Sequence, residues 1–130
     1  MVFDADTRPV RVMATNQALT ASYVDIGTPL DTRVIRAFGV FSDFTANDST
    51  GVTLRAVAQQ EANGDDYEIS VGLGTSGEIS FTDATDIKRL DTFLVQDSTP
   101  FVQLQAKATV VGATAGTLSV NVKMEKQVFR

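Results

Sequence analysis

The residues best suited to chemistry in this sequence are acidic side chains gathered in turn-rich segments. Carboxylate and amide oxygens from such segments are the ligands that Ca²⁺ prefers. The candidate calcium ligands are Asp43, Asp48, Asp65 and Asp66. Their spacing does not match a helix-flanked calcium loop, and Asp is also common in turns because it satisfies neighbouring backbone N–H groups. The sequence therefore favours solvated turns, with calcium binding as the alternative, and predicts no cofactor.

A second motif with chemical meaning is the run from Gly72 to Gly77, which matches the dinucleotide fingerprint G-x-G-x-x-G. That fingerprint requires a strand before it and a helix after it, so that the phosphates meet the helix N-terminus. The residues that follow, EISFTDATD, do not resemble the start of a helix. We therefore expect a loop in which glycine supplies positive φ angles.

The composition also limits catalysis. The chain has no cysteine and no histidine, which removes disulfides, thiolate nucleophiles and the commonest general base. Carboxylate pairs such as Glu61 with Glu68, or Asp65 with Glu78, have no spacing that selects them as an acid and a base. The sequence predicts a protein that is not an enzyme.

Charge and hydropathy exclude two further classes of partner. The formal net charge is −5, and residues 41–91 hold most of the acids, which argues against nucleic acid as a ligand. No apolar run approaches the roughly 18 residues of a membrane span. The N-terminal residues include early acids and lack the apolar core of a secretory signal, so we expect no membrane partner and no secretory route.

Alternation of apolar and polar residues is the dominant structural signal. It runs through residues 52–58, 102–110 and 118–124. The segment from Arg33 to Phe41 is apolar on both faces, which predicts a central strand covered on both sides. Gly27-Thr28-Pro29 reads as a turn that ends an earlier strand.

The C-terminal ribbon, residues 99–126, has the most regular alternation. Its two halves are separated by GATAG, residues 112–116, a loop length that suits a β-hairpin. With about seven or eight strands at even spacing, the sequence predicts an all-β fold. We expect a single antiparallel β-sandwich, jelly-roll-like, with a long C-terminal hairpin.

Two parts of the chain are distinguished within this fold. Residues 1–17 are expected to form an N-terminal arm or an edge strand, since Pro9 and the early acids do not suit the interior of a sheet. Residues 18–130 are expected to form the sandwich. The chain is predicted to act as a homo-oligomer or as copies held on a lattice.

The ribbon also supplies a candidate interface. Its outward residues are neutral and rich in amides, which suits either a wet interface or exposure to solvent. The interface residues that we predict, in the ribbon and near the two termini, are Phe3, Arg8, Arg11, Gln103, Gln105, Lys107 and Phe129. An alternative is a carbohydrate- or cell-surface-binding module, in which Tyr23, Tyr67, Phe44 or Phe81 would be the aromatic platform.

Three stretches carry a family resemblance. SYVDIG near Ser22, TANDSTGVTLRAVAQQEANGDDYEI from Thr45 and TPFVQLQAKATVVGATAGTLSV from Thr99 resemble small virion structural proteins of tailed bacteriophages. In that group a strand meets the turn Val-Gly-Ala-Thr-Ala-Gly and returns as the final strand. Residues 1–17 lie outside the resemblance.

The resemblance implies a virion protein, assembled in the host cytoplasm. The role it implies most directly is capsid decoration or cement, bound to the major capsid protein or other virion proteins. A component of the head–tail junction or of the tail is a further reading. No functional residue of the group has a counterpart here, because such proteins bind through the shape of a surface and not through a motif.

Overall fold

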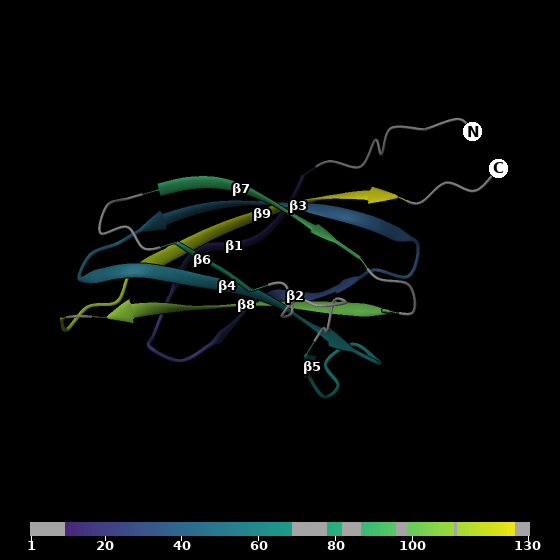
Figure 1. The fold of residues 1–130 in the computed structure, drawn as a ribbon, viewed down its shortest axis with the longest axis horizontal. Coiled ribbons are helices and arrows are strands. Elements are labelled where there is room, and N and C mark those ends of the chain that lie inside the picture. The colour runs from purple at the N-terminus through teal and green to yellow at the C-terminus, as the bar shows by residue number, and fades with distance from the viewer. Residues whose placement is uncertain (1–9, 69–77, 82–86, 96–98, 111, 127–130) are drawn as a thin grey trace.

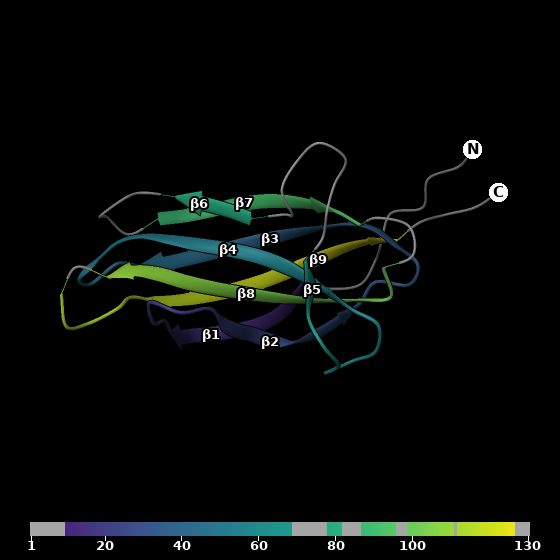
Figure 2. The same ribbon diagram turned by 60° about the horizontal axis from the view of Figure 1, so that its bottom comes forward.

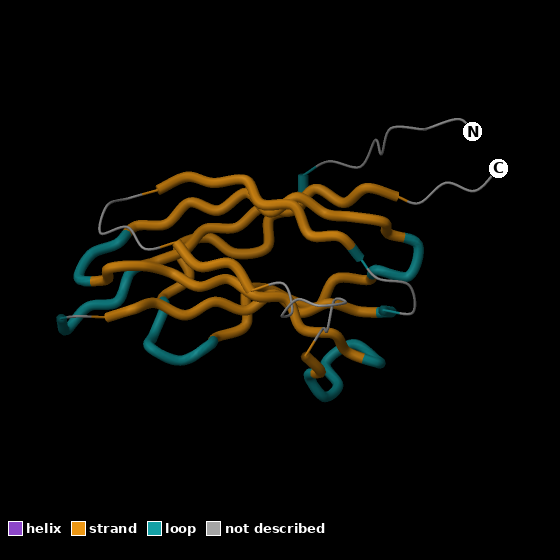
Figure 3. Tube along the Cα trace, in the orientation of Figure 1, coloured by secondary structure: helices purple, strands orange, loops and turns teal. Residues whose placement is uncertain are grey.

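The structure, a computed structural model, describes residues 10–68, 78–81, 87–95, 99–110 and 112–126. Within these ranges the regular structure is entirely β-strand (Figure 3). The strands are β1 Arg11–Ala18, β2 Val24–Asp31, β3 Ile35–Thr45, β4 Ser49–Gln59, β5 Tyr67–Glu68, β6 Glu78–Phe81, β7 Ile87–Leu94, β8 Phe101–Val110 and β9 Thr117–Lys126. No helix in these ranges is long and apolar enough to span a membrane.

The strands form two antiparallel sheets that pack face to face (Figures 1 and 2). Sheet A has the order β1-β9-β3-β7, and sheet B has the order β2-β8-β4-β5 with β6 also on β4. Because β5 and β6 pair with successive parts of β4, they occupy one strand position. If β5 and β6 are counted as one strand, the fifth, then β7, β8 and β9 become the sixth, seventh and eighth strands. The strand orders are then 1-8-3-6 and 2-7-4-5, the double-sheet arrangement of a jelly roll. The predicted jelly-roll-like sandwich is confirmed.

The predicted C-terminal hairpin is wrong. β8 pairs with β2 and β4 in sheet B, whereas β9 pairs with β1 and β3 in sheet A. The ribbon therefore crosses from one sheet to the other at residues 112–116 instead of folding back on itself. Alternation cannot distinguish these cases, because β8 and β9 both direct their apolar rows into the space between the sheets.

The crossing loop is fixed by the neighbouring turn between β3 and β4, which also passes from sheet A to sheet B. The backbone N–H of Asp48 donates to the carbonyl of Thr114 at 3.0 Å, and the Asp48 carboxylate accepts from the N–H of Thr114 at 3.0 Å. The Ser49 hydroxyl accepts from the N–H of Gly116 at 3.0 Å. A Cβ at Gly116 would overlap the carbonyl oxygen of Thr45, so only glycine fits there.

The core lies between the sheets and follows the period-two pattern. Phe38, Val40 and Phe44 of β3 point inward, and the rings of Phe38 and Phe93 stack at 5.3 Å between centroids. The other fully buried large side chains, drawn from β2, β4, β8 and β9, are Ile26, Leu30, Val52, Leu54, Leu104, Leu118, Val120 and Val122. β1 lies at one edge of sheet A and contributes Met13 to this core.

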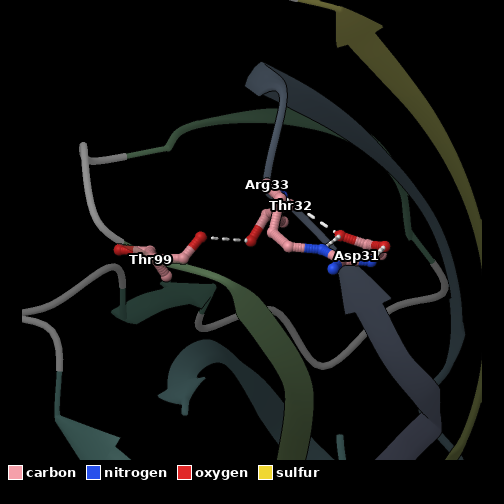
Figure 4. A network of polar contacts seen from close by, with 4 residues as sticks. All are labelled: Asp31, Thr32, Arg33 and Thr99. Carbon is pink, nitrogen blue, oxygen red and sulfur yellow. Dashed lines mark hydrogen bonds and ion pairs between the residues drawn. The ribbon is translucent and has the colours of Figure 1, made fainter. Parts of the chain in front are cut away.

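The turn between β2 and β3 is tied to the start of β8 (Figure 4). The Thr32 hydroxyl donates to the carbonyl of Thr99 at 2.8 Å, and its backbone N–H donates to the carbonyl of Pro100 at 3.0 Å. Beside it, the Arg33 guanidinium binds the Asp31 carboxylate in a bidentate manner: Nε donates to Oδ1 at 2.9 Å and Nη2 donates to Oδ2 at 2.6 Å. The hydrogen bond from the Arg33 side chain lowers the pKa of Asp31 from 3.8 to about 2.

This pair makes a small, pH-dependent contribution to stability. Because the pKa of Asp31 is lower in the folded chain, the contribution is present above pH 4 and disappears as the pH falls toward 2. Both side chains are at least half exposed, so Asp31→Asn is expected to cost under about 1 kcal/mol at pH 7. Urea unfolding at pH 7 and pH 2 measures the effect. A cost that persists at pH 2 would contradict this assignment.

Candidate functional site

The outer face of sheet A carries exposed apolar side chains. Phe41 of β3 is 42% exposed, Leu90 and Leu94 of β7 are 58% and 79% exposed, and Val12 of β1 is 65% exposed. The strand register places Leu90 opposite Phe41, Phe41 opposite Asn121, and Asn121 opposite Val12. This row crosses all four strands and is apolar on β1, β3 and β7, whereas β9 contributes the polar Asn121. We call Val12, Phe41, Leu90 and Leu94 the apolar face.

Two shallow hollows lie on this surface, one on each side of Phe41 and Leu90. The first, of about 400 Å³, is lined on its floor by Ala37 and Gly39 of β3. Gly39 helps to form it, because a side chain at that position would come within 3.2 Å of Leu90 Cδ1. The second, of about 350 Å³, is lined by Asn121 and by charged residues of β3 and β7. The ridge between the two hollows is apolar.

Charged pairs surround the apolar ridge. Lys88 Nζ lies 3.9 Å from an oxygen of Asp43, and Arg36 Nε lies 3.8 Å from an oxygen of Glu125. All four side chains are more than half exposed, so these pairs contribute little to stability. An apolar centre with a charged, solvated rim is the usual anatomy of a protein interface.

The outer face of sheet B is closed by a polar network. The side-chain oxygen of Gln105, Oε1, accepts from Arg55 Nε at 2.8 Å, while its side-chain nitrogen, Nε2, donates to Asp25 at 2.9 Å and to Asp66 at 3.2 Å. Asp66 belongs to the loop after β4, which hangs outside sheet B in Figure 1. Gln105 is only 7% exposed. The part of this face around Gln105 is therefore covered by the chain's own loop.

The Tyr23 ring on the outer face of sheet B is in contact with two of the chain's own cations. The Arg55 guanidinium lies 3.7 Å from the centroid of the Tyr23 ring, and Lys107 Nζ lies 4.7 Å from it. Both cations are within the range of cation–π attraction. Contacts with two of the chain's own cations make Tyr23 a poor platform for a sugar ring.

Gln105 holds this network together, so Gln105→Leu is expected to lower the free energy of unfolding by about 1–3 kcal/mol. Leucine fills a similar volume but removes the Gln105 amide from Asp25, Asp66 and Arg55, leaving Asp66 with the Gln59 amide alone. Denaturant unfolding measures the change. Gln17→Leu is the control, since the Gln17 amide donates only to a neighbouring exposed carbonyl and should change stability by under about 0.5 kcal/mol. Equal effects would contradict the role assigned to Gln105.

The predicted interface residues fall in different places. Phe3, Arg8 and Phe129 lie outside the described residues. Arg11 is exposed at the start of β1 and donates to the Thr28 hydroxyl at 3.2 Å. Lys107 is half-buried beside Tyr23.

Gln103 and Gln105 do not point into solvent as expected. They are 2% and 7% exposed, and the Gln103 amide donates to the carbonyls of Gly27 at 3.2 Å and Leu104 at 2.8 Å. They are buried because β2 and the loop after β4 supply partners for their amides. An interface role for these two residues stays a prediction.

Three of the four candidate calcium ligands, Asp43, Asp48 and Asp66, are engaged with protein groups at separate places. Asp43 contacts Lys88, Asp48 accepts from the crossing loop, and Asp66 binds two glutamine amides. Within the described ranges, no three acidic side chains converge as a metal site would require. The glycine-rich run at residues 72–77 falls outside those ranges.

The apolar face was not found by sequence reasoning. The signal was present, since the segment ending at Phe41 is apolar on both sides and was expected to be covered on both. In a two-layer sandwich only one side of a strand meets the core. Phe44, proposed as an exposed aromatic, is instead completely buried, while Phe41 is exposed. On the second apolar side of β3, Ile35 and Ala37 are buried and Phe41 is the residue left at the surface of the isolated chain.

The fold and this surface define a class: a jelly-roll sandwich with one polar face and one apolar face. Comparison with protein-family models finds no match, and a search of curated protein sequences finds none either. Function must therefore be argued from the surface itself.

Proposed function

We propose that the chain is a structural protein of a phage-like particle, most directly a capsid decoration or cement protein. It acts by binding and not by catalysis, as part of the assembled virion. Its partner is the major capsid protein or another virion protein, contacted through the apolar face. The single observation that carries this proposal is the set of exposed apolar side chains on β1, β3 and β7, three of the four strands of sheet A.

Three further features support the proposal. Jelly rolls are a common architecture of viral capsid domains. The stretches that resemble tailed-phage virion proteins include β4, β8 and the first part of β9, up to Val120. The apolar face is also rigid, because β3 pairs with β7 and β9 along nearly its whole length. A rigid surface loses little conformational entropy on binding.

Co-sedimentation tests this function. Purified chain is mixed with particles from which it has been removed, and the particles are pelleted at increasing protein concentration. The proposal expects saturable binding, with a copy number set by the lattice. Folded protein that stays in the supernatant at every concentration would refute it. A low copy number would instead place the chain at the head–tail junction or in the tail.

Carbohydrate binding is the second candidate, and the hollow of about 350 Å³ favours it. There the exposed ring of Phe41 lies beside the amide of Asn121 and the carboxylate of Asp43, a combination that suits a sugar. Titration with a panel of saccharides, followed by NMR, distinguishes carbohydrate binding from particle binding. Saturable shifts that Asn121→Ala abolishes, without any binding to particles, would favour the sugar.

A further inference from the structure

β7 differs from every other sheet edge that the structure describes. β1 pairs through two register shifts and contains Asn16 at a φ of 49°. β2 has one register shift and contains Gly27 and Pro29. β5 and β6 are only two and four residues long. Shifts, proline and short length are three of the devices that prevent edge-to-edge pairing, and charged side chains are another.

β7 has none of the first three devices, and its charged residues Lys88, Arg89 and Asp91 are of both signs, so they can pair across a shared edge. Its eight residues pair with β3 in an unbroken register, and its sequence IKRLDTFL contains no proline or glycine. Among the described strands it is hydrogen-bonded to β3 alone. Its outer side chains include the exposed Leu90 and Leu94. A long and regular edge with exposed leucines is a template for a further strand.

The sequence of β7 is complementary to itself. Arg89 and Asp91 flank Leu90 and share the inward side of the strand, opposite Ser42 and Val40. We propose that β7 pairs antiparallel with β7 of a second copy, about a two-fold axis at Leu90. Arg89 then lies opposite Asp91 of the partner subunit, and the two Leu90 side chains meet on the outer face. Opposite charges in directly opposed positions favour such pairing.

The state of Asp91 supports this register. Its side chain is 9% exposed, and one carboxylate oxygen is bound by Arg89 Nη2 at 3.0 Å. The other oxygen, Oδ2, is buried and has no hydrogen-bond partner in the described structure. Buried carboxylate oxygens are rarely left unbonded. An arginine opposite Asp91 would donate to that oxygen.

Other registers fit less well. A two-fold axis at Arg89 or at Asp91 places like charges opposite each other, and an axis at Thr92 places Asp91 opposite Phe93. If the pairing of the two β7 strands is shifted by one residue, each residue lies opposite one that points to the other face of its own sheet. The outer face of one chain would then be continuous with the core side of the other. Only the axis at Leu90 brings each Arg89 beside an Asp91.

The pairing would join two copies of sheet A into one continuous sheet of eight strands. The two apolar faces would then form one surface on the same side. This inference deepens the proposed function and rests on it for its biological role. The pairing itself involves only this chain, so it can be tested without particles.

Mixing two charge variants tests the pairing. Arg89→Asp leaves two acids on the inward side of β7, and Asp91→Arg leaves two bases. Each variant alone places like charges opposite each other and should raise the dimer dissociation constant about tenfold or more. An equal mixture should recover a heterodimer, because each acid then faces a base. Mixing does not restore the pair within a chain, so a purely internal role would not be rescued.

Molar mass by light scattering, from low to high micromolar, and native mass spectrometry of the mixture provide the readout. The matched control is Asp31→Arg mixed with Arg33→Asp, an exposed pair with the same spacing. These control variants should dimerise like the wild type, alone and mixed. A wild-type chain that stays monomeric would overturn the pairing, as would folded Arg89 and Asp91 variants that dimerise alone or gain nothing on mixing.

If Asp91→Arg fails to fold, Leu90→Lys decides the question. Leu90 is 58% exposed, so lysine is tolerated by the fold, but two lysines would meet at the axis. Loss of the dimer in this variant supports the pairing, and an unchanged dimer refutes it. Failure of the pairing leaves particle binding by the monomer to be measured separately, so the two failures are distinguishable.

Discussion

Phe44→Ala lowers the free energy of unfolding by about 3–5 kcal/mol, the largest stability effect that we expect from a single substitution in β3. The Phe44 ring is completely buried between the sheets and lies in van der Waals reach of the crossing loop at Gly116. Removing it leaves a cavity that the paired strands around it cannot close. The matched substitution Phe41→Ala, three residues earlier on the other side of the strand, changes stability by under about 1 kcal/mol.

Urea unfolding followed by far-ultraviolet circular dichroism measures both variants. The comparison tests which side of β3 faces the core, because both variants remove a phenyl ring from the same strand, one from each side. Similar losses in the two variants would mean that Phe41 is covered in the isolated chain, and the apolar face would then be part of the core.

The second large effect is on binding to the particle. We expect Phe41→Ala to lower the affinity about thirtyfold, the loss typical of a central aromatic anchor in an interface. Phe41 lies between Leu90 and Asn121 at the middle of the row across sheet A. Its small effect on folding makes the binding result interpretable. Co-sedimentation over a range of concentrations gives the affinity.

Tyr67→Ala is the matched control for that measurement. Tyr67 is 48% exposed, close to the 42% of Phe41, but it lies on β5 of sheet B. Its removal should change the affinity by less than about twofold. If Tyr67→Ala weakens binding and Phe41→Ala does not, sheet B is the binding side and the assignment of the apolar face is wrong.

Much of the fold can be read from alternation. The apolar rows of β4, β8 and β9 were expected in the core and are there. The partners of a strand are less accessible, because β8 and β9 present the same pattern whether they pair or face each other across the core. Only the long-range pairing of β9 with β3 places it in sheet A.

The turn-forming residues of the sequence were misleading in one place. Gly27-Thr28-Pro29 suggested a turn at the end of a strand, yet it lies inside β2. Gly27 adopts a φ of 70° there, at a register shift between Ile26 and Leu30. Glycine at positive φ serves a turn and a bulge equally well, so the residue types do not decide between them.

The candidate surface was harder to predict than the fold. Polar alternation marked Gln103 and Gln105 as outward, which is correct, but not as covered by the loop that carries Asp66. Conversely, the apolar outer side of β3 suggested a complete covering layer, but the described structure covers Ile35 and Ala37 and leaves Phe41 exposed. In both cases exposure depends on segments distant in the sequence.

The central claim is that the outer face of sheet A is buried in the assembled particle. The chain has no cysteine, so a single introduced thiol reports on one position. Thr92→Cys places a thiol on the outer face of sheet A, and Thr109→Cys places one on the outer face of sheet B, both at exposed positions. Rates of maleimide labelling are compared between free and particle-bound protein. We expect binding to slow labelling at position 92 at least about tenfold and at position 109 by less than about twofold. Protection of position 109 with free labelling of position 92 would contradict the claim.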